Sequence, residues 1–191
     1  MKKIVLASGS PRRKALLEQV RLKFTVDPNI EEEAGPAGLS PERLVEEISR
    51  KKAESVASKH HDAIIISADT VGVLGDRIIG KPGSESQARE ILSLLSGKAH
   101  KVITGFTIID TSTGKAVTRS VETKVFMKRL KDAEIEAYVK TREPMDKAGA
   151  YAIQGLGAVL VEQIEGDYSN VMGLPLAALA EALKEFGVNV L

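Results

Sequence analysis

Two long strand candidates, residues 98–110 and 116–129, restrict the fold more than any other feature of this sequence. Their residue types favour β-strands, and the linking residues Thr111-Ser-Thr-Gly114 are typical of a tight turn, so the two strands are expected to pair antiparallel. Strands of this length indicate one extended sheet that two lobes share.

The remaining pattern alternates expected strands with amphipathic helices. Expected strands are residues 4–7, 24–26, 63–74, 77–79 and 158–164, and expected helices are residues 11–20, 40–58, 84–95, 132–140 and 175–186. Residues 149–157 are expected to form a glycine-punctuated loop. The sequence therefore predicts a single α/β domain over residues 1–191, with a mixed β-sheet and flanking helices.

The composition argues against several classes of function. Lysine plus arginine (27) almost balances aspartate plus glutamate (26), so no broad basic face is expected for a nucleic-acid polymer. No cysteine is present, which excludes thiol nucleophiles and leaves oxygen ligands for any metal. The apolar runs are too short for a signal sequence or a membrane span, so we expect a cytoplasmic protein that binds no membrane.

The segment Ser8-Gly9-Ser10-Pro11-Arg12-Arg13 lies between the first expected strand and the first expected helix. Ser10 is a favourable N-cap and Pro11 suits the first helical turn, so the backbone amides of that turn would face an anion. Arg12 and Arg13 add guanidinium groups that match phosphate oxygens. The alternative is a surface helix whose basic residues are merely solvated.

Asp69 interrupts an otherwise apolar strand segment. A carboxylate placed there is either satisfied by neighbours, as at a strand edge or bulge, or used as a general base or metal ligand. The triplet Glu31-Glu32-Glu33 offers a second carboxylate for a hard divalent cation, although such a triplet is more often a solvated loop.

Further side chains could complete a nucleotide site. Lys52 and Lys81, together with Arg12 and Arg13, would balance the charge of a nucleoside triphosphate, although each lysine could equally be solvated. Gln154 offers a donor and an acceptor that suit a pyrimidine edge, or it is an ordinary turn residue. The three histidines do not form a metal-ligand set.

Six blocks of the chain resemble the Maf family of nucleotide pyrophosphatases in order and spacing. The blocks are Leu6–Arg13, Ala68–Val71, Gly80–Pro82, Ser96–Gly105, Asp146–Gly155 and Asn170–Pro175. The resemblance implies an extended mixed sheet with flanking helices in two lobes around a cleft, as in the inosine triphosphate pyrophosphatases (Ham1). It also implies a homodimer that uses a divalent cation, Mg²⁺ or alternatively Mn²⁺ or Co²⁺, to hydrolyse nucleoside triphosphates to the monophosphate and pyrophosphate.

The resemblance also implies roles for individual residues. Asp69 corresponds to the catalytic proton acceptor and, with Glu32, to a metal ligand; because the preceding loop is one residue shorter than in relatives, Glu31 or Glu33 could replace Glu32. The residues that correspond to contacts with the triphosphate and the transition state are Ser8, Ser10, Arg13, Lys52 and Lys81.

Three positions separate two branches of this family. The branch that acts on 7-methyl-GTP has an aromatic residue, glutamine and glutamate where this chain has Arg12, Thr70 and Gln154. The chain therefore resembles the branch that hydrolyses dTTP, UTP and modified uridine triphosphates and so removes non-canonical nucleotides. The alternative function is a catalytically silent, nucleotide-binding regulator of cell division and septum formation.

Overall fold

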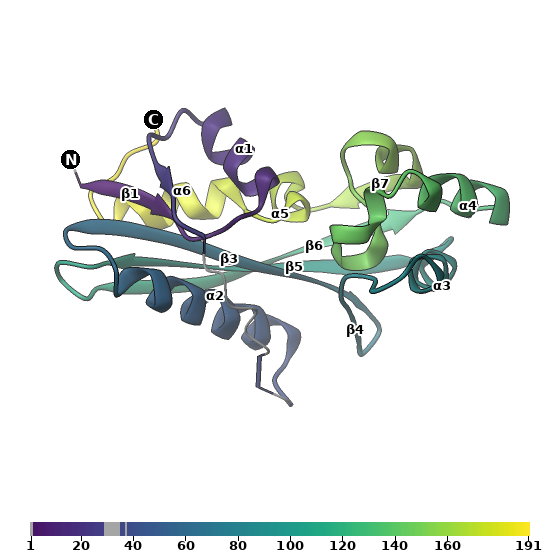
Figure 1. Cartoon of the computed structure of the whole chain (residues 1–191), viewed down its shortest axis with the longest axis horizontal. Helices are drawn as coiled ribbons and strands as arrows, with labels where there is room; N and C mark the ends of the chain where they lie inside the picture. The colour runs from purple at the N-terminus through teal and green to yellow at the C-terminus, as the bar shows by residue number, and fades with distance from the viewer. Residues whose placement is uncertain (1, 29–34, 37) are drawn as a thin grey trace. The chain divides into compact units, whose positions relative to one another are not determined.

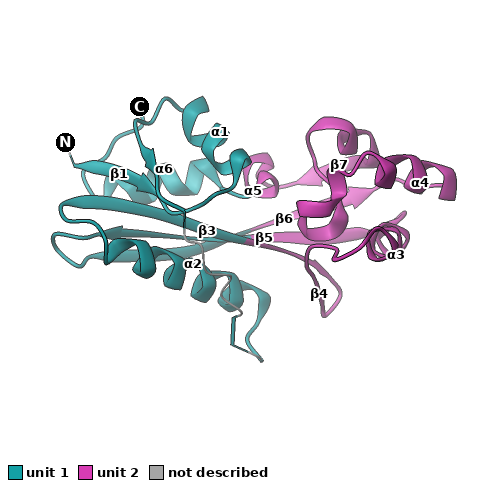
Figure 2. Cartoon of the chain, in the orientation of Figure 1, with its two compact units in different colours: residues 1–69, 104–121, 173–191 teal, residues 70–103, 122–172 magenta. Residues whose placement is uncertain are grey.

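The computed structural model describes residues 2–28, 35–36 and 38–191, and its chain divides into two compact units. Unit 1 comprises residues 1–69, 104–121 and 173–191, and unit 2 comprises residues 70–103 and 122–172 (Figure 2). Each of the long strands β3 (Ala63–Leu74), β5 (Ala99–Asp110) and β6 (Ala116–Met127) belongs partly to each unit. The predicted long strands and their sharing by two lobes are thereby confirmed.

The strands of unit 1 are parallel where the sequence is most apolar. β1 (Lys3–Leu6) pairs in parallel with β2 (Thr25–Val26) and with the first half of β3, where Leu6 lies opposite Ile66. Parallel strands are covered on both faces, which explains the continuous apolar run 63–66. Figure 1 shows α1 (Pro11–Gln19) and α6 (Leu176–Lys184) on one face of these strands and α2 (Pro41–Ala57) on the other.

Unit 2 contains antiparallel pairs. The turn Gly75-Asp76 joins β3 to β4 (Arg77–Ile79), and β7 (Val161–Glu165) pairs antiparallel with β6. Helices α3 (Glu85–Leu95) and α4 (Asp132–Lys140) pack together, and their apolar residues join those of β6 in one buried cluster. This cluster is the core of unit 2.

Most predicted element types are confirmed, whereas the structure of residues 143–172 differs from the prediction in several elements. Residues 155–160 form a 3₁₀ helix, η3, so β7 begins at Val161 rather than at residue 158. The expected loop 149–157 contains part of η2 (Ala148–Ala150), which follows η1 (Glu143–Asp146). A 3₁₀ turn has no long apolar period, so the apolar residues 158–160 could not be distinguished from the start of the strand that follows.

The short helix α5 (Tyr168–Met172) was not predicted. The Asp167 carboxylate precedes it and accepts hydrogen bonds from the backbone N–H groups of Ser169 (2.7 Å) and Asn170 (3.2 Å). This is a side-chain cap of the kind that starts helices. Five residues are too few for a helical period to show in the sequence.

The described residues include no helix that is both long and apolar enough to cross a bilayer.

His100 is a buried polar residue of β5, with an exposed fraction of only 3%. Its Nε2 lies 2.9 Å from the Tyr151 hydroxyl, and the two rings meet edge to face. Burial lowers the pKa of His100 to about 4, so the imidazole is neutral at pH 7. The folded protein consequently binds fewer protons at this side chain than the unfolded chain does between pH 6.5 and 4.

We therefore expect the free energy of unfolding to fall as the pH drops from about 6.5 to 4, by up to roughly 3 kcal/mol from this residue. The variant His100→Gln removes the titrating group and should flatten that part of the profile. Urea denaturation at several pH values measures it; equal slopes for both proteins would show that His100 does not titrate in this way.

Candidate active site

The corner between β1 and α1 has the predicted backbone but not the predicted cap. Ser10 occupies the N-cap position and Pro11 begins the helix, yet the Ser10 side chain makes no capping hydrogen bond. The backbone N–H of Ser10 instead donates to the Oγ of the buried Ser8 at 3.3 Å. Ser10 therefore contributes its position at the helix start rather than the expected side-chain cap.

Arg13 anchors this corner to the segment before α6. Its Nε donates to the Gly173 carbonyl at 2.8 Å, and its Nη1 donates to the Ser8 Oγ at 3.1 Å. Desolvation lowers the pKa of Arg13, the nearby Asp69 carboxylate raises it, and Arg12 lowers it. A desolvated guanidinium beside a second arginine makes this corner favourable for an anion.

Lys52 and Asp69 form an ion pair that the sequence could not reveal. The Lys52 Nζ lies 2.6 Å from the Asp69 Oδ1, and the two side chains are about one-fifth exposed (22% and 18%). Lys52 comes from α2 and Asp69 from β3, so the pair joins a helix to the sheet. Because the pair is still open to solvent, the carboxylate remains accessible to water or to a ligand.

A buried set of hydroxyl groups fixes α2 over the sheet at this point. The Ser67 Oγ donates to the Ser49 carbonyl at 2.5 Å, and the Ser49 Oγ lies 2.9 Å from the Thr107 Oγ1. Ser67 precedes Asp69 by two residues and so shares its face of β3, while Ser49 precedes Lys52 by about one helical turn. The same contact therefore sets the register in which Lys52 meets Asp69.

Gly105 permits the close approach of α2 to β5. A Cβ at this position would lie 2.5 Å from both the carbonyl carbon and the oxygen of Val45, which belong to the helix backbone. Backbone atoms cannot turn aside as a flexible side chain can, so only glycine fits without moving α2.

The candidate metal ligands fall into two groups. Glu31, Glu32 and Glu33 lie outside the described residues, so the expected second carboxylate has no structural account. The described residues contain no group of three histidine, cysteine, aspartate or glutamate side chains suited to a metal. Asp69 by itself fits Mg²⁺, which commonly binds one or two carboxylates and completes its octahedron with water and phosphate oxygens.

Thr70, Lys81 and Gln154 lie in unit 2. Thr70 directly follows Asp69 in β3, and Lys81 is an exposed residue just after β4. The backbone N–H of Gly149 donates to the Gly80 carbonyl at 3.1 Å, which ties the strand end before Lys81 to the segment before Gln154. Gln154 itself is exposed and immediately precedes η3.

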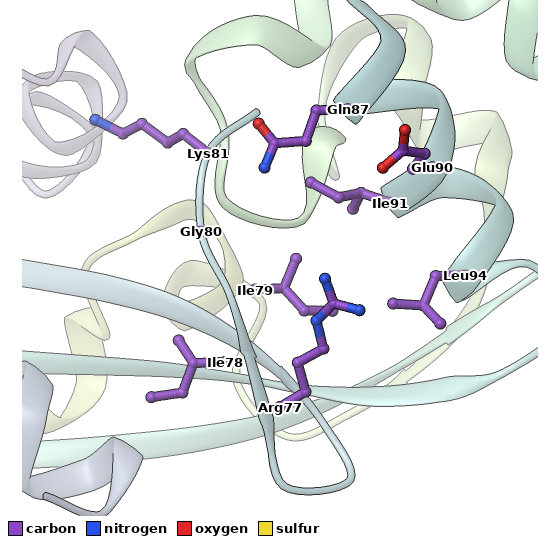
Figure 3. A pocket seen from close by; sticks show the side chains of 9 residues that line it. All are labelled: Arg77, Ile78, Ile79, Gly80, Lys81, Gln87, Glu90, Ile91 and Leu94. Carbon is purple, nitrogen blue, oxygen red and sulfur yellow. The ribbon is translucent and has the colours of Figure 1, made fainter. Parts of the chain in front are cut away.

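A pocket of about 250 Å³ lies between β4 and α3, and Lys81 is the one predicted site residue among those that line it. Figure 3 shows its lining residues, with the Lys81 side chain extending away from the others. Its polar side chains are those of Arg77, Lys81, Gln87 and Glu90, and neither Asp69 nor Gln154 lines it.

The model of Maf-like proteins matches residues 3–186 of the chain. The chain belongs to the Maf family. It is 49% identical over 193 residues to the dTTP/UTP pyrophosphatase of Alkaliphilus metalliredigens, with all of both chains covered. It is 50% identical over 191 residues to the dTTP/UTP pyrophosphatase of Dictyoglomus turgidum, covering 100% of this chain and 99% of that protein.

A solved HAM1 protein from Coxiella burnetii has the same fold as this Maf protein. The TM-score is 0.59 at 16% sequence identity, with 97% of this chain and 100% of that chain covered. The predicted Ham1-like mixed α/β fold is thereby confirmed. At this identity the likeness concerns the fold alone.

Sequence reasoning missed the residues that hold the Maf site in shape. Ser49, Ser67 and Gly105 carry no pattern of their own, because their importance depends on the distance between α2 and the sheet. The signals available were that Gly105 ends one of the blocks that resemble the family and that the block 170–175 contains Gly173, whose carbonyl accepts a hydrogen bond from Arg13.

Gly105→Ala tests this close packing. The added methyl group must push α2 away from β5, so we expect a loss of about 1–3 kcal/mol in the free energy of unfolding, measured by urea denaturation. Gly72→Ala is the matched control in β3, because its Cβ would meet its nearest neighbour at an ordinary 3.4 Å. Equal destabilisation of both variants would contradict the account.

Proposed function

We propose that this Maf protein hydrolyses dTTP, UTP and modified uridine triphosphates to the nucleoside monophosphate and pyrophosphate. The observation that carries the proposal is the Lys52–Asp69 pair, whose carboxylate acts electrostatically on Arg13 at the β1–α1 corner. Relatives that are about half identical over their full length bear the name dTTP/UTP pyrophosphatase. An anion-attracting corner with a carboxylate nearby fits phosphoanhydride hydrolysis better than simple storage of a nucleotide.

The triphosphate would bind chiefly to unit 1. The first turn of α1 directs its dipole and backbone amides toward the corner, where Ser8, Ser10, Arg12 and Arg13 supply further donors. Lys52 contributes a cation beside Asp69, and the resemblance adds Lys81 from unit 2. These groups would stabilise the charge that develops on the leaving phosphates.

Asp69 would orient the attacking water and accept its proton. The water oxygen forms a bond to the α-phosphorus while the bond from that phosphorus to the bridging α,β-oxygen breaks, and its electron pair leaves with pyrophosphate. Lys52 holds Asp69 Oδ1 at 2.6 Å, which fixes the carboxylate in one orientation. Such positioning is the main contribution that a protein makes to phosphoryl chemistry.

A divalent cation, Mg²⁺ or alternatively Mn²⁺ or Co²⁺, would neutralise phosphate charge when bound. Asp69 would hold it, together with a carboxylate from the segment 31–33, for which we propose Glu32.

The base would be selected by residues whose types match the pyrimidine branch of the family. Gln154 can donate to and accept from a uracil or thymine edge, whereas a glutamate there could only accept when ionised. Arg12 and Thr70 are the accompanying branch positions. On the same resemblance we propose that residues 1–191 act as one domain, in a cytoplasmic homodimer that removes non-canonical nucleotides and uses free nucleotides rather than nucleic acid or membranes.

Asp69→Asn tests the chemical step. The amide keeps the shape of the side chain but cannot accept a proton, so kcat for UTP with Mg²⁺ should fall by roughly 10²–10⁴-fold while the protein stays folded. Release of pyrophosphate measures kcat, and Asp76→Asn in the exposed β3–β4 turn is the control. Wild-type turnover by Asp69→Asn would refute the assignment; tight nucleotide binding by the wild type without turnover would support the regulator instead.

Gln154→Glu tests base selection. The carboxylate loses the donor and repels the uracil O4 and O2 acceptors, so kcat/KM for UTP and dTTP should fall by about tenfold or more relative to that for GTP. A panel of triphosphates at fixed Mg²⁺ measures the ratio. An unchanged ratio would mean that another residue reads the base.

A further inference from the structure

The segment that carries Gln154 is held by a carboxylate that the proposed reaction does not use. The backbone N–H of Leu156 donates to the Glu143 Oε2 at 3.2 Å, and that of Gly157 donates to the Glu143 Oε1 at 2.9 Å. One side chain therefore binds two consecutive amides just after Gln154. Gln154 and Leu156 are exposed, so the contact holds the backbone of the segment and leaves these two side chains accessible to solvent.

The other end of the same segment is bound to the partner of Glu143. The Tyr138 hydroxyl donates to the Glu143 Oε1 at 2.9 Å and accepts from the backbone N–H of Ala152 at 3.0 Å. Residues 152 and 157 are thus tied to one hydrogen-bonded pair, which we call the Tyr138–Glu143 clamp. The clamp closes a short ring of backbone around Gln154.

Steric contacts show how little room the clamp leaves. A Cβ at Gly157 would lie 2.3 Å from the Ala152 carbonyl oxygen and 2.5 Å from the Tyr138 hydroxyl. A Cβ at Gly155 would lie 2.7 Å from the Glu143 Oε2, and Gly155 also has a φ of +66°. Both glycines are required if the segment is to close on the clamp.

The charges favour an ionised glutamate at this place. Burial raises the pKa of Glu143, but hydrogen bonds from Gly157, Tyr138 and Leu156 together lower it below its usual value. Burial raises the pKa of Tyr138, so its hydroxyl keeps its proton and remains a donor. Hydrogen bonds to an ionised acceptor are stronger than those between neutral groups.

We propose that Glu143, acting with Tyr138, is a positioning residue that presets the Gln154 segment for reading the pyrimidine base. This inference rests on the proposed function. An exposed loop that is already ordered loses less conformational entropy when the nucleotide binds. Gln154 can therefore distinguish a pyrimidine from other bases with a smaller loss of binding free energy. Other residues bind the reacting phosphates. Loss of the clamp should therefore affect the affinity for the base and the preference among bases more than the rate of the chemical step.

The first test follows the backbone in nucleotide-free protein. Glu143→Gln keeps the shape but places an NH₂ group against an N–H or O–H donor, so at least one hydrogen bond is lost. Amide hydrogen exchange at Leu156 and Gly157 should then accelerate by about tenfold or more. Tyr138→Phe removes the hydroxyl that binds Ala152 and serves as a second variant. Unchanged exchange in both variants would overturn the proposal.

The second test compares nucleotides. For Glu143→Gln, KM for UTP and dTTP should rise by about tenfold while kcat changes by less than about threefold, and the preference over GTP should narrow. The control is Glu136→Gln, which makes the same change in a half-buried ion pair between Glu136 of α4 and Arg89 of α3. A merely structural glutamate would lower stability without altering the preference, and that result would refute the proposal.

The wild-type protein separates this inference from the proposed function. Absence of pyrophosphate release from every triphosphate by the wild type would remove the proposed function and with it the role of the clamp in base reading. Turnover by the wild type with the same preference in Glu143→Gln would remove the role of the clamp alone.

Discussion

The contact between α2 and the sheet at Gly105 is the constraint on which the candidate site depends. The helix backbone passes so close to β5 that no Cβ fits, and the Ser67–Ser49 hydrogen bond fixes the helix along its axis. Lys52 reaches Asp69 only because both conditions hold. A helix that lay farther from the sheet would leave a carboxylate without its cation in a partly desolvated place, which is costly.

The charged groups of the candidate site in unit 1 interact with one another and do not form separate ion pairs. Asp69 is held directly by Lys52 and also acts on Arg13, which is itself hydrogen-bonded to Ser8 and Gly173. The positive charges of Arg12 and Arg13 repel each other, and the single negative charge of Asp69 offsets them only in part. An anionic ligand would relieve this repulsion, whereas a cationic one would increase it.

The fold was largely predictable from the sequence, and the residue types of the proposed site could be named from it. Period and turn residues located the helices and the long strands, because those elements span enough residues to show a pattern. The 3₁₀ helix at 155–160 and α5 were missed because elements this short show no repeating apolar pattern. The residue types at Asp69, Arg13 and Lys52 indicated charge chemistry, yet their contacts could not be predicted, since they depend on the docking of α2.

Glu143 illustrates a different limit. In the sequence it is one of many glutamates, and no local pattern distinguishes it from a solvated residue. Its role appears only once the backbone of residues 152–157 folds back onto it. Side chains that bind backbone amides of distant segments leave no periodic signal, because the partner is the main chain and not a particular residue type.

In the segment 152–157, different residues hold the loop in shape and contact the proposed base. The frame is built from Tyr138, Glu143 and two glycines, while the side chain at position 154 touches solvent and supports none of these contacts. Substitutions at position 154 should therefore cost little folding free energy. Such an arrangement offers protein engineers a place to retune nucleobase preference by exchanging one residue while the scaffold beneath it stays intact.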